Sequence, residues 1–243
     1  MPPWFSESKD AMAIHITGIG WVTAGGMGCA REQKAFAMTD GPLPVVAVDA
    51  AHPASRRMDA FSKLGMAAIA FALKDAGLAA ETDRRKIGII AATEYGCLGT
   101  DLDYFDTVLA TGGQGASPGL FSYTLPSVFL GEAAIRFGLT GPTFIVNEDN
   151  RQQPTCVKTA MGCIAGGDAP QMLCGICHPE GLPAFSKIRP GPSGALFFLI
   201  EKSPAGRFSY GELNLTPAGH LLFNGNRSND LADLVQQCLA VFS

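Results

Sequence analysis

Short apolar runs alternate with longer helical patterns along this chain, which indicates βαβ units and a mostly parallel sheet covered by helices on both faces. The predicted fold class is therefore α/β. The predicted strands span 13–17, 86–92, 143–146, 169–175, 195–201 and 208–215. The last two are expected to form an antiparallel pair, because only the short turn from Ser203 to Gly206 separates them.

Six longer segments have the periodicity of helices: 30–38, 58–76, 100–110, 127–137, 155–165 and 229–241. The second is apolar nearly all round, so we expect it to be buried between layers and to end at Gly77. Side chains between Asn226 and Asp230 are suited to cap the last helix. Pro and Gly concentrate at 111–119 and 179–194, which we interpret as loops within one domain over 1–243, preceded by a flexible stretch at 1–12.

The composition predicts a globular protein with one sizeable core, with 243 residues, 47% hydrophobic positions and a net charge of -4. A pI near 5.5 and no basic run longer than 84–86 argue against a nucleic-acid partner. No apolar run reaches the roughly 20 residues of a membrane span, and the N-terminus lacks a signal-like apolar region, so a cytoplasmic location is expected. Seven cysteines, several of them in apolar runs, indicate buried free thiols rather than disulfides.

Two motifs offer cofactor sites that we do not favour. Glycines between Thr17 and Gly28 follow a strand, but their spacing is not that of a dinucleotide fingerprint, and a tight connection explains them better. The run from Cys174 to His178 matches a covalent haem motif, yet no export signal accompanies it. A zinc site using Cys156, Cys163, Cys174 and Cys177 is a further alternative, in which only the last pair has zinc-like spacing. We expect neither a cofactor nor a metal.

A family resemblance rests on segments that occur in the family's order. The most specific segment is 133–142, which reads Ala-Ala-Ile-Arg-Phe-Gly-Leu-Thr-Gly-Pro. The others are 15–23, 57–65, 73–78, 86–90 with the turn at Gly96 and Gly99, and 117–118. Together they resemble the N-terminal half of β-ketoacyl synthases, over most of 14–201. The resemblance implies a thiolase-like half-fold, in which the family's second half is absent from this chain.

In active members of that family, the strand after the Gly-Pro pair ends in a catalytic cysteine at the N-terminus of a buried helix, where the helix dipole lowers the thiol pKa. Counting from Gly141 and Pro142, that place falls on Asn150. An amide cannot form an acyl thioester, although it can donate a hydrogen bond to a developing enolate oxygen. The nearest thiol, Cys156, lies beyond Pro154 and is expected to point elsewhere.

The family's two catalytic histidines also have no match among His15, His52, His178 and His220, the last of which we interpret as structural. A ketosynthase-like chain without nucleophile or histidines resembles a chain-length factor of type II polyketide or aryl polyene systems, related in chemistry to fatty acid elongation. The resemblance implies two partners, an active ketosynthase in a heterodimer and an acyl carrier protein. The alternatives are an acyltransferase that uses Cys156 and a free-standing acyl-binding scaffold.

The predicted helix 100–110 places Leu102, Phe105 and Leu109 on one face by their spacing. In the resembled family this helix borders the acyl tunnel near the dimer interface, so these residues and Phe129 are candidates for contact with the acyl chain. Phe121 and the segment 125–129 are further candidates for tunnel or interface surface. The alternative interpretation of the apolar face is an ordinary core stripe.

Overall fold

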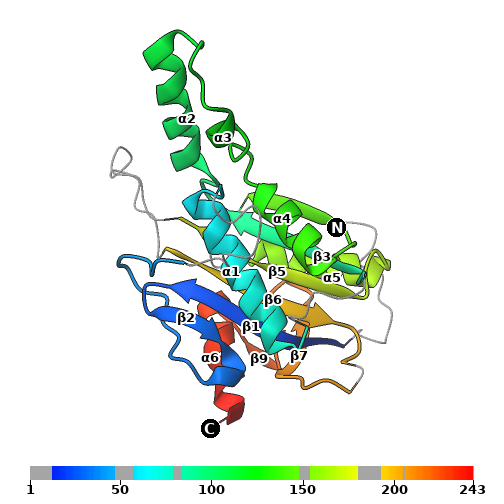
Figure 1. The fold of residues 1–243 in the computed structure, drawn as a ribbon. Coiled ribbons are helices and arrows are strands. Elements are labelled where there is room, and N and C mark those ends of the chain that lie inside the picture. The colour runs from blue at the N-terminus through cyan, green and yellow to red at the C-terminus, as the bar shows by residue number, and fades with distance from the viewer. Residues whose placement is uncertain are drawn as a thin grey trace.

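The computed structural model describes residues 13–46, 57–78, 84–147, 154–179, 193–204 and 206–242. They form one mixed sheet with helices on both faces (Figure 1). The strands are β1 (Ile14–Thr23), β2 (Gly26–Cys29), β3 (Ile87–Thr93), β4 (Thr143–Asn147), β5 (Gln171–His178), β6 (Gly194–Glu201), β7 (Gly211–Leu215), β8 (Leu221–Phe223) and β9 (Asn226–Arg227). The helices are α1 (Ala60–Asp75), α2 (Leu98–Thr111), α3 (Pro118–Phe121), α4 (Val128–Phe137), α5 (Thr155–Gly166) and α6 (Leu231–Leu239), with short 3-10 turns at Ala30–Glu32 and Ala240–Phe242.

The strand order is β4-β3-β5-β6-β1-β7-β8-β9, and β2 pairs with β1 outside this path. β3 lies parallel to β4 and β5, whereas β6 is antiparallel to both β5 and β1. Four of the five strands from β4 to β1 therefore run in one direction, and β6 runs against them. This agrees with the predicted α/β class and with a mixed, mostly parallel central sheet.

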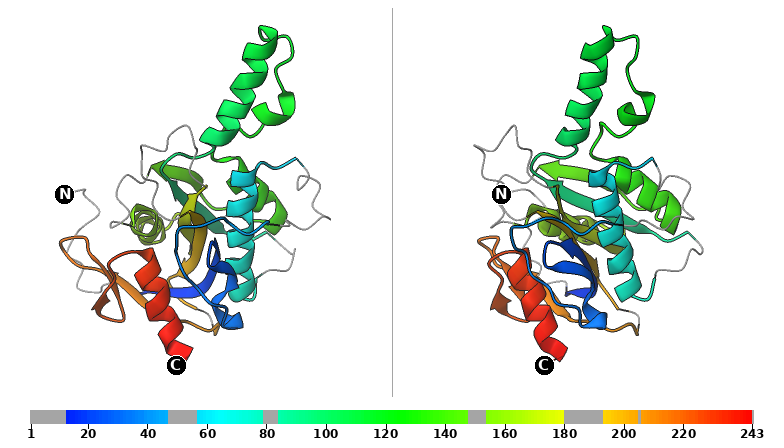
Figure 2. Two further views of the ribbon diagram at one scale, coloured as in Figure 1. Left: turned by 90° about the vertical axis from the view of Figure 1, so that its left-hand side faces the viewer. Right: turned by 60° about the vertical axis from the view of Figure 1, so that its left-hand side comes forward.

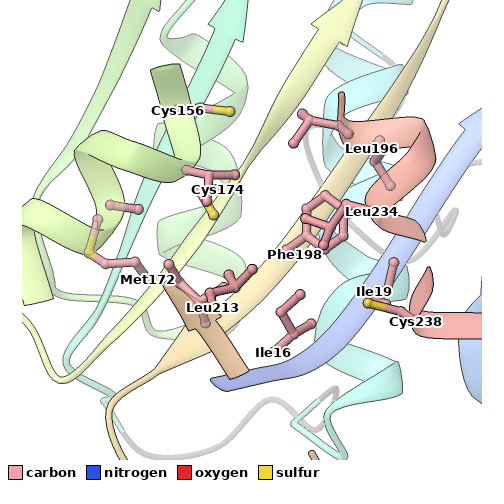
Figure 3. Packing of buried hydrophobic residues seen from close by; sticks show 14 of the residues in the cluster. Ile16, Ile19, Cys156, Met172, Cys174, Leu196, Phe198, Leu213, Leu234 and Cys238 are labelled. Atoms are coloured by element: carbon pink, nitrogen blue, oxygen red, sulfur yellow. The ribbon is translucent and has the colours of Figure 1, made fainter. Parts of the chain in front are cut away.

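Each face of the sheet has its own hydrophobic core, and the alternation of side chains along β6 separates the two. Leu196, Phe198 and Ile200 pack with α5 and α6, as Figure 3 shows for Leu196 and Phe198. Phe197 and Leu199 pack on the opposite face with α1 and α4. Figure 2 shows α1 on one side of the sheet and α5 and α6 on the other. Because both faces are covered, every residue of β6 is buried.

Helix α1 lies unusually close to β1, and two glycines make this possible. A Cβ atom on Gly20 would lie 2.2 Å from the backbone nitrogen of Ala72, and one on Gly18 would lie 2.4 Å from the Ala72 carbonyl oxygen. These glycines lie inside β1, so they permit helix–strand packing and do not form the tight connection that we expected from the sequence. The helix ends as predicted, with Gly77 at φ +73° and the Leu78 nitrogen donating to the Leu73 carbonyl.

The predicted helix 30–38 is wrong beyond its first turn. Gln33 adopts a left-handed conformation with φ 50°, and the chain then continues without helical structure to residue 39. Phe36 is nevertheless buried, because its ring meets the edge of the Trp21 ring with the centroids 5.3 Å apart. Phe36 is therefore buried against Trp21 of β1 by a segment that has no helical structure.

The predicted pairing of 195–201 with 208–215 is also wrong. β6 and β7 are not neighbours, because β1 lies between them and is antiparallel to both. The chain crosses the start of β1, where the Tyr210 nitrogen donates to the Ile16 carbonyl. A short connection favours pairing of the two strands that it joins. Here the long and mostly buried strand β1 lies between β6 and β7 and pairs with both.

A buried carboxylate fastens the C-terminal part of the chain to this core. Asp75 is 1% exposed and accepts hydrogen bonds from the Ile19 nitrogen (2.8 Å), the Arg31 nitrogen (2.8 Å) and the Tyr210 hydroxyl (2.6 Å). Burial, followed by the bond to Asp75, raises the pKa of Tyr210 far above its usual range, so the phenol stays a donor. Asp230 caps α6 through the Asp233 nitrogen, as predicted. Within the described ranges, no helix is both long and apolar enough to cross a membrane.

Candidate functional site

The place that the resemblance assigns to the catalytic nucleophile lies between β4 and α5 in the sequence. Residues 148–153 are outside the described residues, so the assignment of Asn150 to this place stays a prediction. The flanking elements have the expected order, because β4 ends at Asn147 and α5 begins at Thr155 after the N-cap residue Pro154. A strand followed in the sequence by a helix is thus present, as the resemblance implies.

Cys156 lies in the first turn of α5 and has no exposed surface. It belongs to the hydrophobic core between α5 and the sheet, together with Cys174 of β5 (Figure 3). Burial, and secondarily the nearby Cys156, raise the pKa of the Cys174 thiol well above its usual range. A thiol enclosed in this way is inaccessible to an acyl thioester unless its neighbours move, which argues against Cys156 as a nucleophile.

The remaining candidate motif, Cys174 to His178, does not form a shared site. Cys174 packs in the core on the α5 side of the sheet, and Cys177 packs in the core on the α1 side. Residues three apart in a strand point to opposite faces, so these two thiols cannot bind one metal ion. In the described part of the chain, no group of three metal-ligating side chains comes together. All seven cysteines are free thiols, and Cys163 alone among them is only half-buried.

The histidines are also dispersed. His15 lies near the start of β1, where its Nδ1 is 3.4 Å from the Ser209 hydroxyl. His178 is buried at the end of β5, and His220 is exposed in the turn before β8. His52 lies outside the described residues. The three described histidines therefore form no catalytic pair with one another.

The most distinctive surface is an arm at residues 98–127, which contains α2 and α3 and stands away from the sheet (Figures 1 and 2). α3 folds back on one face of α2: the Tyr104 and Phe121 rings lie 5.4 Å apart, and the Ser117 nitrogen donates to the Thr107 hydroxyl at 3.0 Å. The contacts of α2 are mainly with α3. One side of α2 is therefore covered, and the opposite side faces away from the rest of the arm.

That uncovered side bears the apolar face predicted from the sequence. Phe105 is 54% exposed, Leu109 is 65% exposed, and Leu102 is half-buried near the root of the arm. We call these three residues the α2 stripe. Phe121 and Leu125 elsewhere on the arm are also more than 60% exposed. The alternative interpretation of the stripe as ordinary core does not hold for this chain, because nothing described covers it.

Phe129 does not lie with the α2 stripe. Its side chain is fully buried beneath α1, where the rings of Phe61 and Phe197 meet it edge-on at centroid distances of 5.3 and 6.4 Å. Gly65 of α1 makes room for it, since a Cβ there would lie 2.4 Å from the Phe129 ring. The structure thus brings together three of the four residues proposed to contact the acyl chain and places the fourth in the core.

A carboxylate that has no assigned role in the sequence analysis, that of Asp59, connects the root of the arm to α1. One Asp59 oxygen caps α1 by accepting from the Ser62 nitrogen at 2.9 Å, and the other accepts from the Thr100 hydroxyl at 2.5 Å. Burial and the carboxylates of Asp101 and Asp59 raise the pKa of Cys97, at the start of α2, to about 12. An Asp before a helical pattern predicts an N-cap. The second bond of Asp59, from the distant Thr100, cannot be predicted from that pattern.

Comparison with known proteins identifies the family. Residues 46–190, more than half of the chain, match the family described as beta-ketoacyl synthase, N-terminal domain. Among solved structures, a beta-ketoacyl synthase from Burkholderia phymatum STM815 is 20% identical, with a TM-score of 0.64, over 83% of this chain and 63% of that one. The ishigamide ketosynthase/chain length factor is 17% identical, with a TM-score of 0.65, over 84% and 62% of the two chains.

The ketosynthase ApeO in complex with its chain length factor ApeC, from Xenorhabdus doucetiae, matches with a TM-score of 0.55 at 19% identity, over 79% of each chain. At such identities the likeness shows the fold, which is the thiolase-like ketosynthase fold. This chain spans less than two thirds of the length of the first two structures. By the match over more than half of its residues, the chain belongs to the β-ketoacyl synthase family through its N-terminal domain.

Proposed function

We propose that this chain is a non-catalytic ketosynthase-like subunit, which pairs with an active β-ketoacyl synthase and shapes the tunnel that receives the growing acyl chain. In this role it acts as a chain-length factor for polyketide or aryl polyene assembly on an acyl carrier protein. The observation that carries the proposal is the exposed α2 stripe, presented on an arm that stands away from the sheet.

Exposure of large apolar side chains in one place favours association, because covering a Phe or Leu side chain contributes about 1.5–3 kcal/mol. The stripe presents Phe105 and Leu109 on a helix face that no described element of this chain covers. β4 offers a second contact surface, since it ends the strand order and no strand among the described residues pairs with its outer edge. A partner that covers both would bury apolar side chains and pair the strand edge.

The proposal of a subunit without chemistry rests on the thiols. Asn150 occupies the expected place of the nucleophile in the sequence, and Cys156 is enclosed in the core. A covalent acyl intermediate needs an accessible thiolate, and neither residue supplies one. The contribution of the chain is therefore one of shape: the α2 stripe forms part of the wall against which the acyl chain ends.

Co-expression with a ketosynthase encoded beside this chain, followed by gel filtration and product analysis, tests the proposal. We expect a heterodimer, and we expect Phe105→Ala to lengthen the products, because a smaller side chain leaves room for further acyl units. Val241→Ala is the matched control, since Val241 is 47% exposed and belongs to the turn Ala240–Phe242. This turn follows α6, at the end of the chain marked C in Figure 1, away from the arm. The control variant should leave product lengths unchanged.

The other outcomes distinguish the alternatives. A chain that never joins a heterodimer rejects the proposal and favours a free-standing acyl-binding scaffold. Rapid stoichiometric labelling of Cys156 by an acyl-thioester probe favours an acyltransferase instead. If the heterodimer forms and Phe105→Ala leaves the product lengths unchanged, Phe105 does not limit chain growth.

A further inference from the structure

The α2 stripe is bordered by carboxylates on both sides. At 100° per residue, Leu102, Phe105 and Leu109 fall within about 60° of one another around the helix. Asp106 lies next to them on one side, followed by Asp103, and Asp101 lies on the other side. Asp103 and Asp106 are exposed, and Asp101 is half-buried near Cys97. The apolar surface of α2 therefore lies between two acidic edges.

No basic residue balances these charges locally in the sequence. Between Glu94 and Arg136, the charged residues are Asp101, Asp103, Asp106 and Glu132, all of them acidic. Both α2 and α3 lie within this interval. All charged side chains of the arm are therefore acidic, and they lie on both sides of the apolar α2 stripe.

We propose that the α2 stripe docks into an apolar groove whose rim bears lysine or arginine side chains, on a protein other than a second copy of this chain. This inference rests on the proposed function, in which that protein is the active ketosynthase, and it adds the chemistry by which the partner is selected. The stripe supplies the buried contact, and its acidic borders select the partner.

Charge complementarity explains why the occupant is a different protein. Opposite charges at the rim of an interface steer the two proteins together and raise the association rate, whereas like charges brought together are unfavourable. If the arms of two copies of this chain met, three carboxylates of α2 would face three identical carboxylates, with no basic residue of either arm between them. The same residues therefore favour a basic partner and oppose pairing through two arms.

The experiment measures the association rate of this chain with its co-purified ketosynthase, after the two subunits have been separated and remixed. At low ionic strength, we expect Asp103→Asn with Asp106→Asn to lower the rate roughly threefold or more. At about 1 M salt, where the screening length is about 3 Å, we expect the variant and the original chain to associate equally fast.

The matched control is Asp168→Asn with Glu212→Gln, which also removes two negative charges. Asp168 precedes β5, and Glu212 of β7 lies opposite His15 in the register, near the start of β1. Both therefore lie at the end of the sheet where β1 and β5 begin, whereas the arm follows the other end of the parallel strand β3. This control should associate at nearly the original rate. Equal rates for the original chain and the α2 variant at low salt overturn the inference and leave the proposed function standing. Failure of every ketosynthase to bind overturns the proposed function, and this inference with it.

Discussion

Replacing Phe129 with alanine is expected to lower the free energy of unfolding by about 3–5 kcal/mol, the range for removal of a fully buried Phe side chain. Phe129 has no exposed surface, and its ring makes edge-on contacts with Phe61 and Phe197. The substitution removes both contacts. Phe105→Ala removes the same atoms from a side chain that is 54% exposed, so its cost should be about 1 kcal/mol or less. The two substitutions therefore separate core from docking surface.

Urea unfolding followed by circular dichroism measures the difference. With a slope of about 2 kcal/mol per molar urea, Phe129→Ala should lower the midpoint by roughly 2 M and Phe105→Ala by about 0.5 M or less. If Phe129→Ala is too unstable to purify, Phe129→Leu should give the same ranking with a smaller loss. Equal midpoint shifts for the two positions, or a larger shift for Phe105, would refute the placement of α2 outside the core.

Two further predictions concern the buried polar and thiol groups. Tyr210→Phe leaves Asp75 with two backbone donors and should lower the free energy of unfolding by about 1.5–3 kcal/mol; a loss below about 0.5 kcal/mol in the same urea assay would contradict the role of this bond. In native protein, a thiol reagent should modify Cys163 first. The reaction should be slow near neutral pH and faster as the pH rises, because burial and Asp168 raise the pKa of Cys163 and only the thiolate reacts. Early modification of Cys156 would show that it is accessible.

The sequence predicted those elements whose pattern is local. α1, α4 and α5 have helical periodicity over several turns, and their observed bounds lie within two residues of the prediction. Gly77 ends α1 as expected, because a left-handed residue at a helix end is a local requirement that glycine meets. The short strands β2, β8 and β9 and the single turn α3 were not predicted, since segments of two to four residues contain too little pattern.

Features that depend on distant neighbours were not predictable in this way. A helix was predicted over 30–38, but after its first turn the chain has no helical structure, and Phe36 is buried against the distant Trp21 ring. Gly18 and Gly20 resembled a turn because their partner, α1, lies some 50 residues later in the sequence. The separation of β6 from β7 by β1 likewise follows from packing across the whole sheet.

In the candidate site, too, the local pattern was predictable from the sequence, whereas the burial of each side chain was not. Periodicity identified the stripe formed by Leu102, Phe105 and Leu109, but a period shows only that one face is apolar, not whether the chain itself covers that face. Phe129 belongs to a similar pattern in α4, and Gly65 of α1 makes room for its ring in the core. Only the fold distinguishes these two cases.

We propose that this chain pairs with an active ketosynthase and takes no covalent part in the reaction. Native mass spectrometry of the co-expressed complex, after treatment with a chloroacetyl-pantetheine probe, tests both parts together. We predict a 1:1 heterodimer with one probe attached to the ketosynthase and none to this chain. A probe attached to Cys156 of this chain, or the absence of any heterodimer, would contradict it.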